Sequence, residues 1–521
     1  MTRRFLFVIC FLLVLPGIFL YRVLVSRALP SGELSTGVSI VGPASLSTLL
    51  QATGPLRVDS ANPRYFTDGS GKAILLTGSH TWANFQDTGY SDPPPVFDYT
   101  AYLNFLHANN HNFFRLWTWE QAEGAPWTTA GIWFSPLPYQ RTGPGTALDG
   151  KPKFDLDKFN QAYFDRLRQR VIQAGDRGIY VSIMLFDGWS IEMKASEPGN
   201  PWPGHPFNGS NNINGVDGDL NHNGQGEETH TLQSSTITAY QEAYVRKVID
   251  TVNDLDNVLY EISNESPSNS QAWQYHMINY IKSYEATKPK QHPLGMTVEY
   301  PGGDNSELFA SPADWISPND AGVYMDNPPA ADGHKVIVSD TDHLWGTGGN
   351  RQWMWKSFTR GINPIFMDCY DAYYCEGDNP NDPAWVSLRK NMGYALSYAD
   401  RMDLEAMTPH GELASTNYCL ANPSSTNAEY LVYQPTGGSF SVDLSASSGP
   451  LYVEWLNPSN GQTINSGTVS GGGSRNFTPP FRGDAVLYIS FSQNVSIPTT
   501  TPKPPQNLNH KIYLPGIVGP S

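Results

Sequence analysis

Eight short apolar runs alternate with helical patterns between residues 55 and 410, and this alternation restricts the fold more than any other feature. Amphipathic stretches at 164–175 and 240–252 precede the third and fourth runs. The pattern predicts an α/β fold, a (β/α)8 TIM barrel. A doubly wound open sheet is the alternative, but its glycine-rich first turn is not found in "LLTGSHTW" (75–82). The runs are "AILLTG" (73–78), "NFFRLW" (112–117), "IYVSIMLF" (179–186), "NVLYEIS" (257–263), "LGMTVEY" (294–300), "DWISP" (314–318), "KVIVSD" (335–340) and "NPIFMD" (363–368).

The composition changes after residue 411, where short alternating strands are separated by Gly, Ser, Pro and Asn. This pattern predicts a small all-β sandwich accessory domain over residues 411–492. Residues 29–54 read as a linker, and residues 493–521 as a Pro/Thr-rich linker and C-terminal tail. The expected strands are "EYLVYQP" (429–435), "SFSVDLS" (439–445), "PLYVEWLNP" (450–458) and "AVLYISFS" (485–492).

The N-terminus combines a short basic segment with an apolar run from Phe5 to about Leu20. Residues 1–28 are therefore expected to be an export signal, either a cleaved signal peptide or a signal anchor that holds the protein to a membrane. We expect an extracellular or cell-surface protein. The formal net charge of −16 argues against nucleic acid or an anionic membrane surface as partner.

Four cysteines are too few for a disulfide scaffold, and Cys10 lies in the signal segment. In an oxidising compartment Cys369 and Cys375 can bridge across "CYDAYYC"; small half-buried thiols are the alternative. No CxxC metal or redox pair is present.

Two glutamates belong to the fourth run and the loop after it. In a (β/α)8 barrel the reacting groups stand at the carboxyl ends of strands. Glu265 lies in the loop "SNESPSN", whereas Glu261 lies four residues earlier, about 13 Å down the strand. We therefore expect Glu261 to be a structural carboxylate with a buried partner and Glu265 to be the chemical candidate.

A second carboxylate is expected from "VIVSDTDHLWG" (336–346), which places Asp340 and Asp342 on one face. Two opposed carboxylates are what glycosidic bond cleavage needs: one protonates the leaving oxygen, and the other attacks the anomeric carbon or activates water. Trp platforms with short polar groups suit a sugar, although a single Trp or His is more often core. The predicted substrate-binding residues are His80, Trp82, Arg115, Trp117, Trp119, Asp187, Asn264, His343 and Trp345.

A polar loop, "DGDLNHNGQGEETH" (217–230), comes close to calcium-loop spacing. His230 occupies the position where a closing glutamate is expected. A metal-free loop that shapes the groove is the favoured interpretation, a structural calcium ion is the alternative, and no obligatory metal or other cofactor is expected.

The stretches at 62–87, 257–266 and 336–346 resemble the apiosidase-like glycoside hydrolases, a (β/α)8 group often followed by a module with a collagen-binding label. Residues 411–492 resemble that module. More distantly, the chain is similar to the retaining cellulase and mannanase clan. That resemblance implies that Glu265, which follows Asn264, is the acid/base, that Arg115 steadies the nucleophile, and that the nucleophile ends the seventh strand.

The chain departs from that clan at the seventh strand, where it has Asp340 and Asp342 instead of a glutamate. Counting along the strand favours Asp340, and a bulge would transfer the role to Asp342. The sequence thus predicts an exported glycoside hydrolase that acts on a polysaccharide or oligosaccharide, and the resemblance implies a retaining course. The alternatives are a non-catalytic carbohydrate-binding protein of the cell surface and, less favoured, a collagenase, since no H-E-x-x-H or G-x-S-x-G motif occurs.

Overall fold

The computed structural model describes residues 54–194, 197–321, 323–370 and 379–491. The expected export segment, most of the linker and the C-terminal tail lie outside these ranges, as does Cys375. Cys369 is disulfide-bonded, and Cys419 is a free, buried thiol. Among the described residues, no helix is long and apolar enough to cross a membrane.

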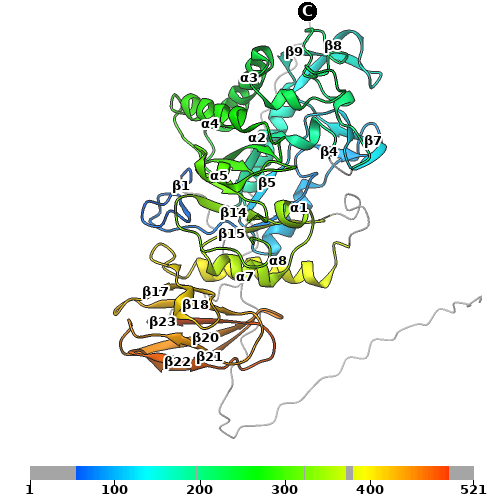
Figure 1. The fold of residues 1–521 in the computed structure, drawn as a ribbon. Coiled ribbons are helices and arrows are strands. Elements are labelled where there is room, and N and C mark those ends of the chain that lie inside the picture. Colours follow the sequence, from blue (N-terminus) through cyan, green and yellow to red (C-terminus); the bar gives the residue numbers. More distant parts are fainter. Residues whose placement is uncertain (1–53, 195–196, 322, 371–378, 492–521) are drawn as a thin grey trace, which may run out of the picture. The chain divides into compact units, whose positions relative to one another are not determined.

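Eight parallel strands form one nearly closed sheet, which confirms the predicted barrel (Figure 1). Neighbouring strands pair in parallel along the whole order, and Asn112 N–H donates to the Thr77 carbonyl at 3.1 Å where the first and second strands meet. In chain order the strands are β3 (Gly78–His80), β5 (Phe113–Leu116), β10 (Tyr180–Asp187), β11 (Val258–Asn264), β12 (Leu294–Thr297), β13 (Trp315–Ser317), β14 (Val336–Asp340) and β15 (Asn363–Met367).

All eight predicted runs supply these strands in the predicted order, but the first strand begins late. Ile74 pairs with Phe66, and the Thr77 N–H donates to the side-chain oxygen of Asn112. Most of the run at 73–78 therefore packs against the hairpin of β1 (Arg57–Val58) and β2 (Phe66–Thr67) and does not pair with the barrel strands.

Helices follow most of the barrel strands, and the helical patterns at 164–175 and 240–252 are confirmed. Side-chain caps fix several starts: Asn160 accepts the Ala162 N–H, and Ser234 accepts the Ile237 N–H. The described residues between β13 and β14 form no α-helix, in keeping with Pro318, Pro328 and Pro329 in that segment. The helices are α1 (Tyr99–Ala108), α2 (Gln161–Gly175), α3 (Ser235–Val252), α4 (Gln271–Glu285), α5 (Asn305–Ala310), α6 (Asp342–Trp345), α7 (Arg351–Thr359) and α8 (Pro383–Ala399).

Two small antiparallel sheets, which the alternation pattern did not predict, lie largely between β5 and α2 in the sequence. Segments that follow barrel strands meet at the mouth where barrel active sites lie, so these insertions belong to that end. One sheet contains β4 (Asp87–Gly89), β6 (Glu123–Ala125) and β7 (Thr128–Ser135); the other contains β8 (Tyr139–Thr146) and β9 (Pro152–Phe159).

The C-terminal residues form antiparallel sheets, as predicted. Apolar side chains that alternate along the strands, among them Val432, Val442 and Trp455, form a separate buried core. Arg351 of α7 also forms two hydrogen bonds with Asp484 of this region, at 2.8 and 2.9 Å. The strands are β16 (Thr408–Pro409), β17 (Cys419–Asn422), β18 (Glu429–Gln434), β20 (Pro450–Asn457), β21 (Gln462–Ser470) and β23 (Ala485–Ser490) in one sheet, with β19 (Phe440–Asp443) and β22 (Ser474–Phe477) in the other.

Candidate active site

Arg115 of β5 is the central cation of the site, and its side chain has no exposed surface. Nε donates to Glu261 Oε2 at 2.9 Å, and Nη2 donates to Glu261 Oε1 and to Asn264 Oδ1 at 2.7 Å. Nη1 donates to Asp340 Oδ2 at 2.8 Å and to Asp342 Oδ2 at 3.3 Å. One guanidinium thus joins three barrel strands, and Glu261 has the buried partner that its place in the strand predicted.

Asp340 ends β14 and is fully buried. His80 Nε2 lies 3.0 Å from its Oδ1 and 2.8 Å from its Oδ2, and the Asp342 N–H donates to Oδ1 at 3.0 Å. Burial favours the neutral acid, but His80 and Arg115 outweigh burial and hold the pKa of Asp340 below its usual range. Asp340 is therefore an ionised group whose two oxygens are both engaged within the protein.

Asp342 is the first residue of α6, and its side chain keeps 8% of its surface exposed. Its hydrogen bond to Arg115 is the long one of the set, at 3.3 Å. Burial, followed by the charges of Glu265 and Asp340, raises the pKa of Asp342 well above its usual value, although Arg115 acts against them. Asp342 is therefore held less tightly than Asp340.

Glu265 follows the last residue of β11 and has a backbone φ of 46°. This left-handed conformation is uncommon for a non-glycine residue, and such strain often marks a functional position. Trp189 Nε1 donates to its Oε2 at 2.5 Å. Burial raises the pKa of Glu265, with a further contribution from Asp340, while Trp189, Lys194 and Arg115 lower it.

Lys194 fixes the backbone at Glu265. Its ammonium group is almost completely buried and donates to the carbonyl oxygens of Glu265 at 2.9 Å and Tyr300 at 2.7 Å, and to Glu192 Oε1 at 2.6 Å. The segments that follow β10, β11 and β12 are therefore joined at one buried cation.

Asn264 and His343 complete the polar network around Arg115. His343 Nε2 lies 3.1 Å from Asn264 Oδ1, and His343 Nδ1 lies 2.8 Å from the Ser317 hydroxyl. Burial and the neighbouring Arg115 charge lower the pKa of His343 to about 3, so the ring is neutral at ordinary pH. Because Asn264 Oδ1 is an acceptor, Nε2 carries the proton and Nδ1 accepts from Ser317.

The predicted tryptophans fall into two groups. Trp117 and Trp119 are 1% and 2% exposed, so they are core residues rather than open platforms. Trp82 is half-buried and stacks against Trp127, with ring centroids 6.2 Å apart. Trp345 packs edge to face on Trp353 at 5.7 Å.

Two aromatic residues near Glu265 and Trp189 were not predicted from the sequence. Tyr300 is 39% exposed and stacks parallel to Trp189 at 6.1 Å, and Trp127 lies between Trp82 and Trp189. Trp127 belongs to the unpredicted β6–β7 hairpin. The run of half-exposed rings (Trp82, Trp127, Trp189 and Tyr300) is hereafter the aromatic row.

Asp187 and Glu120 form a second carboxylate pair behind the aromatic row. Glu120 Oε1 accepts the Asp187 N–H at 2.9 Å, and Asp187 is fully buried, with Oδ2 accepting from Ser190 at 3.0 Å. Burial and the Glu120 charge raise the pKa of Asp187 well above its usual value. Burial opposes ionisation of Glu120 as well, but His230 and His205 outweigh it and lower the pKa of Glu120 to about 2.

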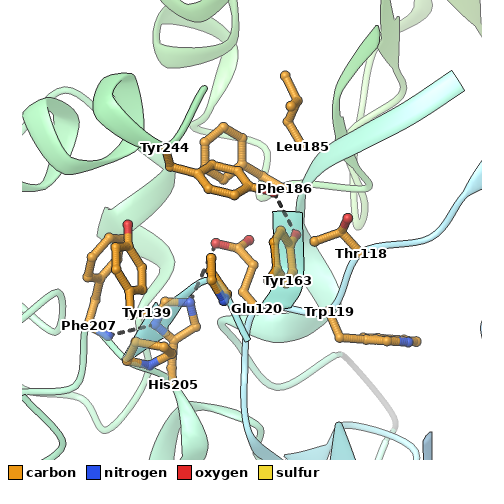
Figure 2. Close-up of a pocket in the computed structure, with 12 residues that line it drawn as sticks. Thr118, Trp119, Glu120, Tyr139, Tyr163, Leu185, Phe186, His205, Phe207 and Tyr244 are labelled. Carbon is orange, nitrogen blue, oxygen red and sulfur yellow. Dashed lines mark hydrogen bonds and ion pairs between the residues drawn. The ribbon is translucent and has the colours of Figure 1, made fainter. Parts of the chain in front are cut away.

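Figure 2 shows the Glu120 carboxylate between His205 and Tyr163 at a cavity of about 20 Å³. A cavity of that size holds about one water molecule and excludes a sugar ring. Glu265, Asp340 and Asp342 do not line it. Glu120 therefore supports Asp187 from the protein interior, and the pair is not a substrate site.

Two family models match parts of the chain. Residues 121–302 match a family described as a domain of unknown function (DUF6298), and residues 410–489 match one described as "Putative collagen-binding domain of a collagenase". The second match agrees with the resemblance noted for residues 411–492. Among curated protein sequences, none matches this chain.

Solved structures share the fold at low sequence identity. One titled "Glycoside hydrolase" is 13% identical, with a TM-score of 0.53, covering 84% of this chain and 97% of that one. A family 5 glycoside hydrolase from Bacteroides vulgatus is 14% identical, with a TM-score of 0.53, covering 86% and 95%. These structures show that a barrel of this kind with its C-terminal sheets is the architecture of known glycoside hydrolases.

Proposed function

We propose that the protein is an exported glycoside hydrolase that cleaves a polysaccharide or oligosaccharide with two carboxylates, Glu265 and Asp342. The observation that carries this proposal is their placement at one barrel mouth: Arg115 donates both to Asp342 and to Asn264, the residue before Glu265. The Glu265 charge also raises the pKa of Asp342. Two coupled carboxyl groups share one proton at intermediate pH, which gives one neutral acid and one carboxylate.

Burial raises the pKa of both groups, and that of Asp342 well above its usual value, so the roles are assigned from the hydrogen-bond donors that each carboxyl group meets. Arg115 donates directly to Asp342 and stabilises the carboxylate there, whereas Glu265 accepts from the neutral Trp189 indole. We therefore assign Glu265 as general acid and base and Asp342 as nucleophile. Strand counting favours Asp340 for the second role, but its oxygens are both engaged and buried.

A retaining course fits this pair better than an inverting one. Carboxyl groups about 5–5.5 Å apart form a covalent intermediate, whereas about 6.5–9.5 Å leaves room for a water molecule. The resemblance of Asn264 and Glu265 to the retaining cellulase and mannanase clan supports the shorter separation. The aromatic row supplies stacking surfaces for sugar rings beside the acid, and this supports a carbohydrate substrate.

Asp342→Asn is expected to reduce kcat by about 10³-fold or more, because the neutral amide is a poor nucleophile. Tm should change little, because the Asp342 carboxylate makes one long hydrogen bond to Arg115 and lies 3.7 Å from His343 Nε2. Asp340→Asn should instead lower Tm, because Arg115 and His80 lose a buried charged partner. Thermal unfolding and turnover of both variants separate the roles. Normal turnover in Asp342→Asn would transfer the nucleophile to Asp340.

The pH profile should respond to Lys194. A general acid must be protonated, and the raised pKa of Glu265 keeps it so above the usual 4.5; activity then falls as pH rises through the folded pKa. Lys194→Met removes a cation that lowers this pKa, so the basic limb of kcat/KM should move to higher pH. Lys151→Met, at an exposed pair with Asp92, is the control. An unmoved or lowered basic limb in Lys194→Met would contradict the assignment.

A further inference from the structure

The loop at residues 217–228 wraps around one buried tryptophan. Trp202 is 2% exposed, and a Cβ added to Gly226 would lie 2.1 Å from its ring, while one added to Gly218 would lie 2.8 Å from it. Only glycine permits this approach at both ends of the loop. The loop is therefore a tightly packed feature rather than a loose connection.

Three polar side chains alternate along this loop. Asp219 accepts the N–H groups of Asn223 and Gly224 at 2.9 Å each, and Asn221 Oδ1 accepts the Asn223 N–H at 2.9 Å. Gly224 then turns the chain with φ of 83°. This is the order of a calcium loop, in which oxygen-bearing side chains at alternate positions precede a glycine turn.

Two glutamates close the loop from the other side. Asn223 Nδ2 donates to Glu227 Oε1 at 2.6 Å, and the Asn221 amide contacts both Glu227 and Glu228. Glu228 is only 5% exposed; the N–H groups of Leu220 and Glu228 lie near its carboxylate, yet its Oε2 has no hydrogen-bond partner. The buried Oε2 of Glu227 also has no partner within the described residues.

These carboxylates lack a compensating cation. In the described part of the chain, no ion pair joins a Lys, Arg or His side chain to Asp219, Glu227 or Glu228, and Glu228 instead experiences the like charges of the other two. A buried, unpaired carboxylate oxygen among like charges is costly unless a cation binds it. Hard oxygen ligands of this kind, with two amide oxygens, suit Ca²⁺.

We propose that residues 219–228 bind a Ca²⁺ ion through Asp219, Asn221, Asn223, Glu227 and Glu228. The sequence spacing favoured a metal-free loop, because the position of the closing glutamate in a calcium loop is occupied by His230. In the structure that ring turns away to the Ser266 hydroxyl at 2.9 Å, and the carboxylates that close the loop stand two and three residues earlier.

The arrangement requires a small adjustment on binding. No three His, Cys, Asp or Glu side chains of the described residues already surround a common ion position. The amide nitrogens of Asn221 and Asn223 instead donate to the carboxylates of Glu227 and Glu228. Turning an amide exchanges its nitrogen for its oxygen and converts a competing donor into a ligand.

The site also connects to the active-site end of the barrel. His230, two residues after Glu228, bonds to Ser266, and Ser266 follows Glu265. Ca²⁺ would thus fix the segment that supports the general acid, although binding itself is independent of the proposed hydrolase activity.

Terbium, which replaces Ca²⁺, should give sensitised emission when tryptophan is excited, because Trp202 touches the loop. Calcium should displace it, and calorimetry of the chelator-treated full-length protein should show one site. Calcium at about 100 times Kd should raise Tm by roughly 3–5 °C. Trp202→Phe should reduce the emission while calcium still binds.

The double variant Glu227→Gln/Glu228→Gln should weaken calcium binding about 100-fold or more, because the site loses two negative ligands. Asp332→Asn is the control, since it also removes a carboxylate charge but lies in an exposed turn outside the loop. Its calcium affinity should equal that of the native protein. Absence of both calorimetric binding and sensitised emission in the native protein, or unchanged affinity in the double variant, would overturn the proposal.

Discussion

Glu265→Gln is expected to reduce kcat/KM by about 10²–10⁴-fold, the usual contribution of a general acid. Glutamine keeps the size of the side chain but cannot supply the proton that the leaving oxygen needs. The loss should be largest for natural glycosides and smaller for aryl glycosides with acidic leaving groups, because a good leaving group needs less protonation. Turnover of both substrate types by the variant and the native protein measures this difference.

Glu299→Gln is the matched control for that experiment. Glu299 is a buried glutamate after β12, and burial raises its pKa to about 7, so a neutral glutamine resembles the acid it replaces. It accepts from Ser270 at 2.9 Å, and within the described part of the chain it makes no hydrogen bond with Arg115, Asp340 or Asp342. Activity should stay near the native value. Equal losses in both variants, or full activity in Glu265→Gln, would remove the acid/base assignment.

Arg115→Met is expected to lower the free energy of unfolding by about 3–5 kcal/mol, since removing one partner of a buried ion pair leaves the other charge uncompensated. Glu261 loses two hydrogen bonds and Asp340 loses one, inside a fully buried network. Chemical denaturation measures the loss. If Arg115→Met is too unstable to purify, Arg115→Lys can be used instead. It keeps the charge, so its free energy of unfolding should lie between those of the native protein and Arg115→Met.

The control for that loss is Arg168→Met. Arg168 pairs with Asp254 through two hydrogen bonds, but both side chains are substantially exposed. Exposed pairs contribute about 0–1 kcal/mol, so this change should be small. Adding Glu261→Gln to Arg115→Met should recover part of the stability, because it removes one unpaired carboxylate. Similar losses in Arg115→Met and Arg168→Met would show that the central network contributes little to stability.

The barrel was predictable because its strands and helices leave periodic patterns within short windows of sequence. All eight strand runs were found in order, and the rule that reacting groups follow strand ends brought Arg115, Asn264 and the acidic candidates to one place. The start of β3 was misplaced because Ile74 pairs outside the barrel, a contact that periodicity does not encode.

Other parts of the site depend on contacts between distant segments. Trp127 and Tyr300 approach Trp189 from different insertions, and Lys194 bonds to carbonyl groups 71 and 106 residues away. The sequence also did not reveal that Asp340 is held more tightly than Asp342. Alternation gave both the same face, but α6 begins at Asp342 and changes the direction of the chain there.

The central claim is that Glu265 and Asp342 together cleave glycosidic bonds. It is tested most directly by incubating a panel of aryl glycosides and purified polysaccharides with the native protein and with the Glu265→Gln/Asp342→Asn double variant, and measuring released aglycone and sugar. The account predicts release from at least one substrate by the native protein and none above background by the folded double variant. Release that persists in the double variant, or no release from any glycoside by the native protein, would contradict it.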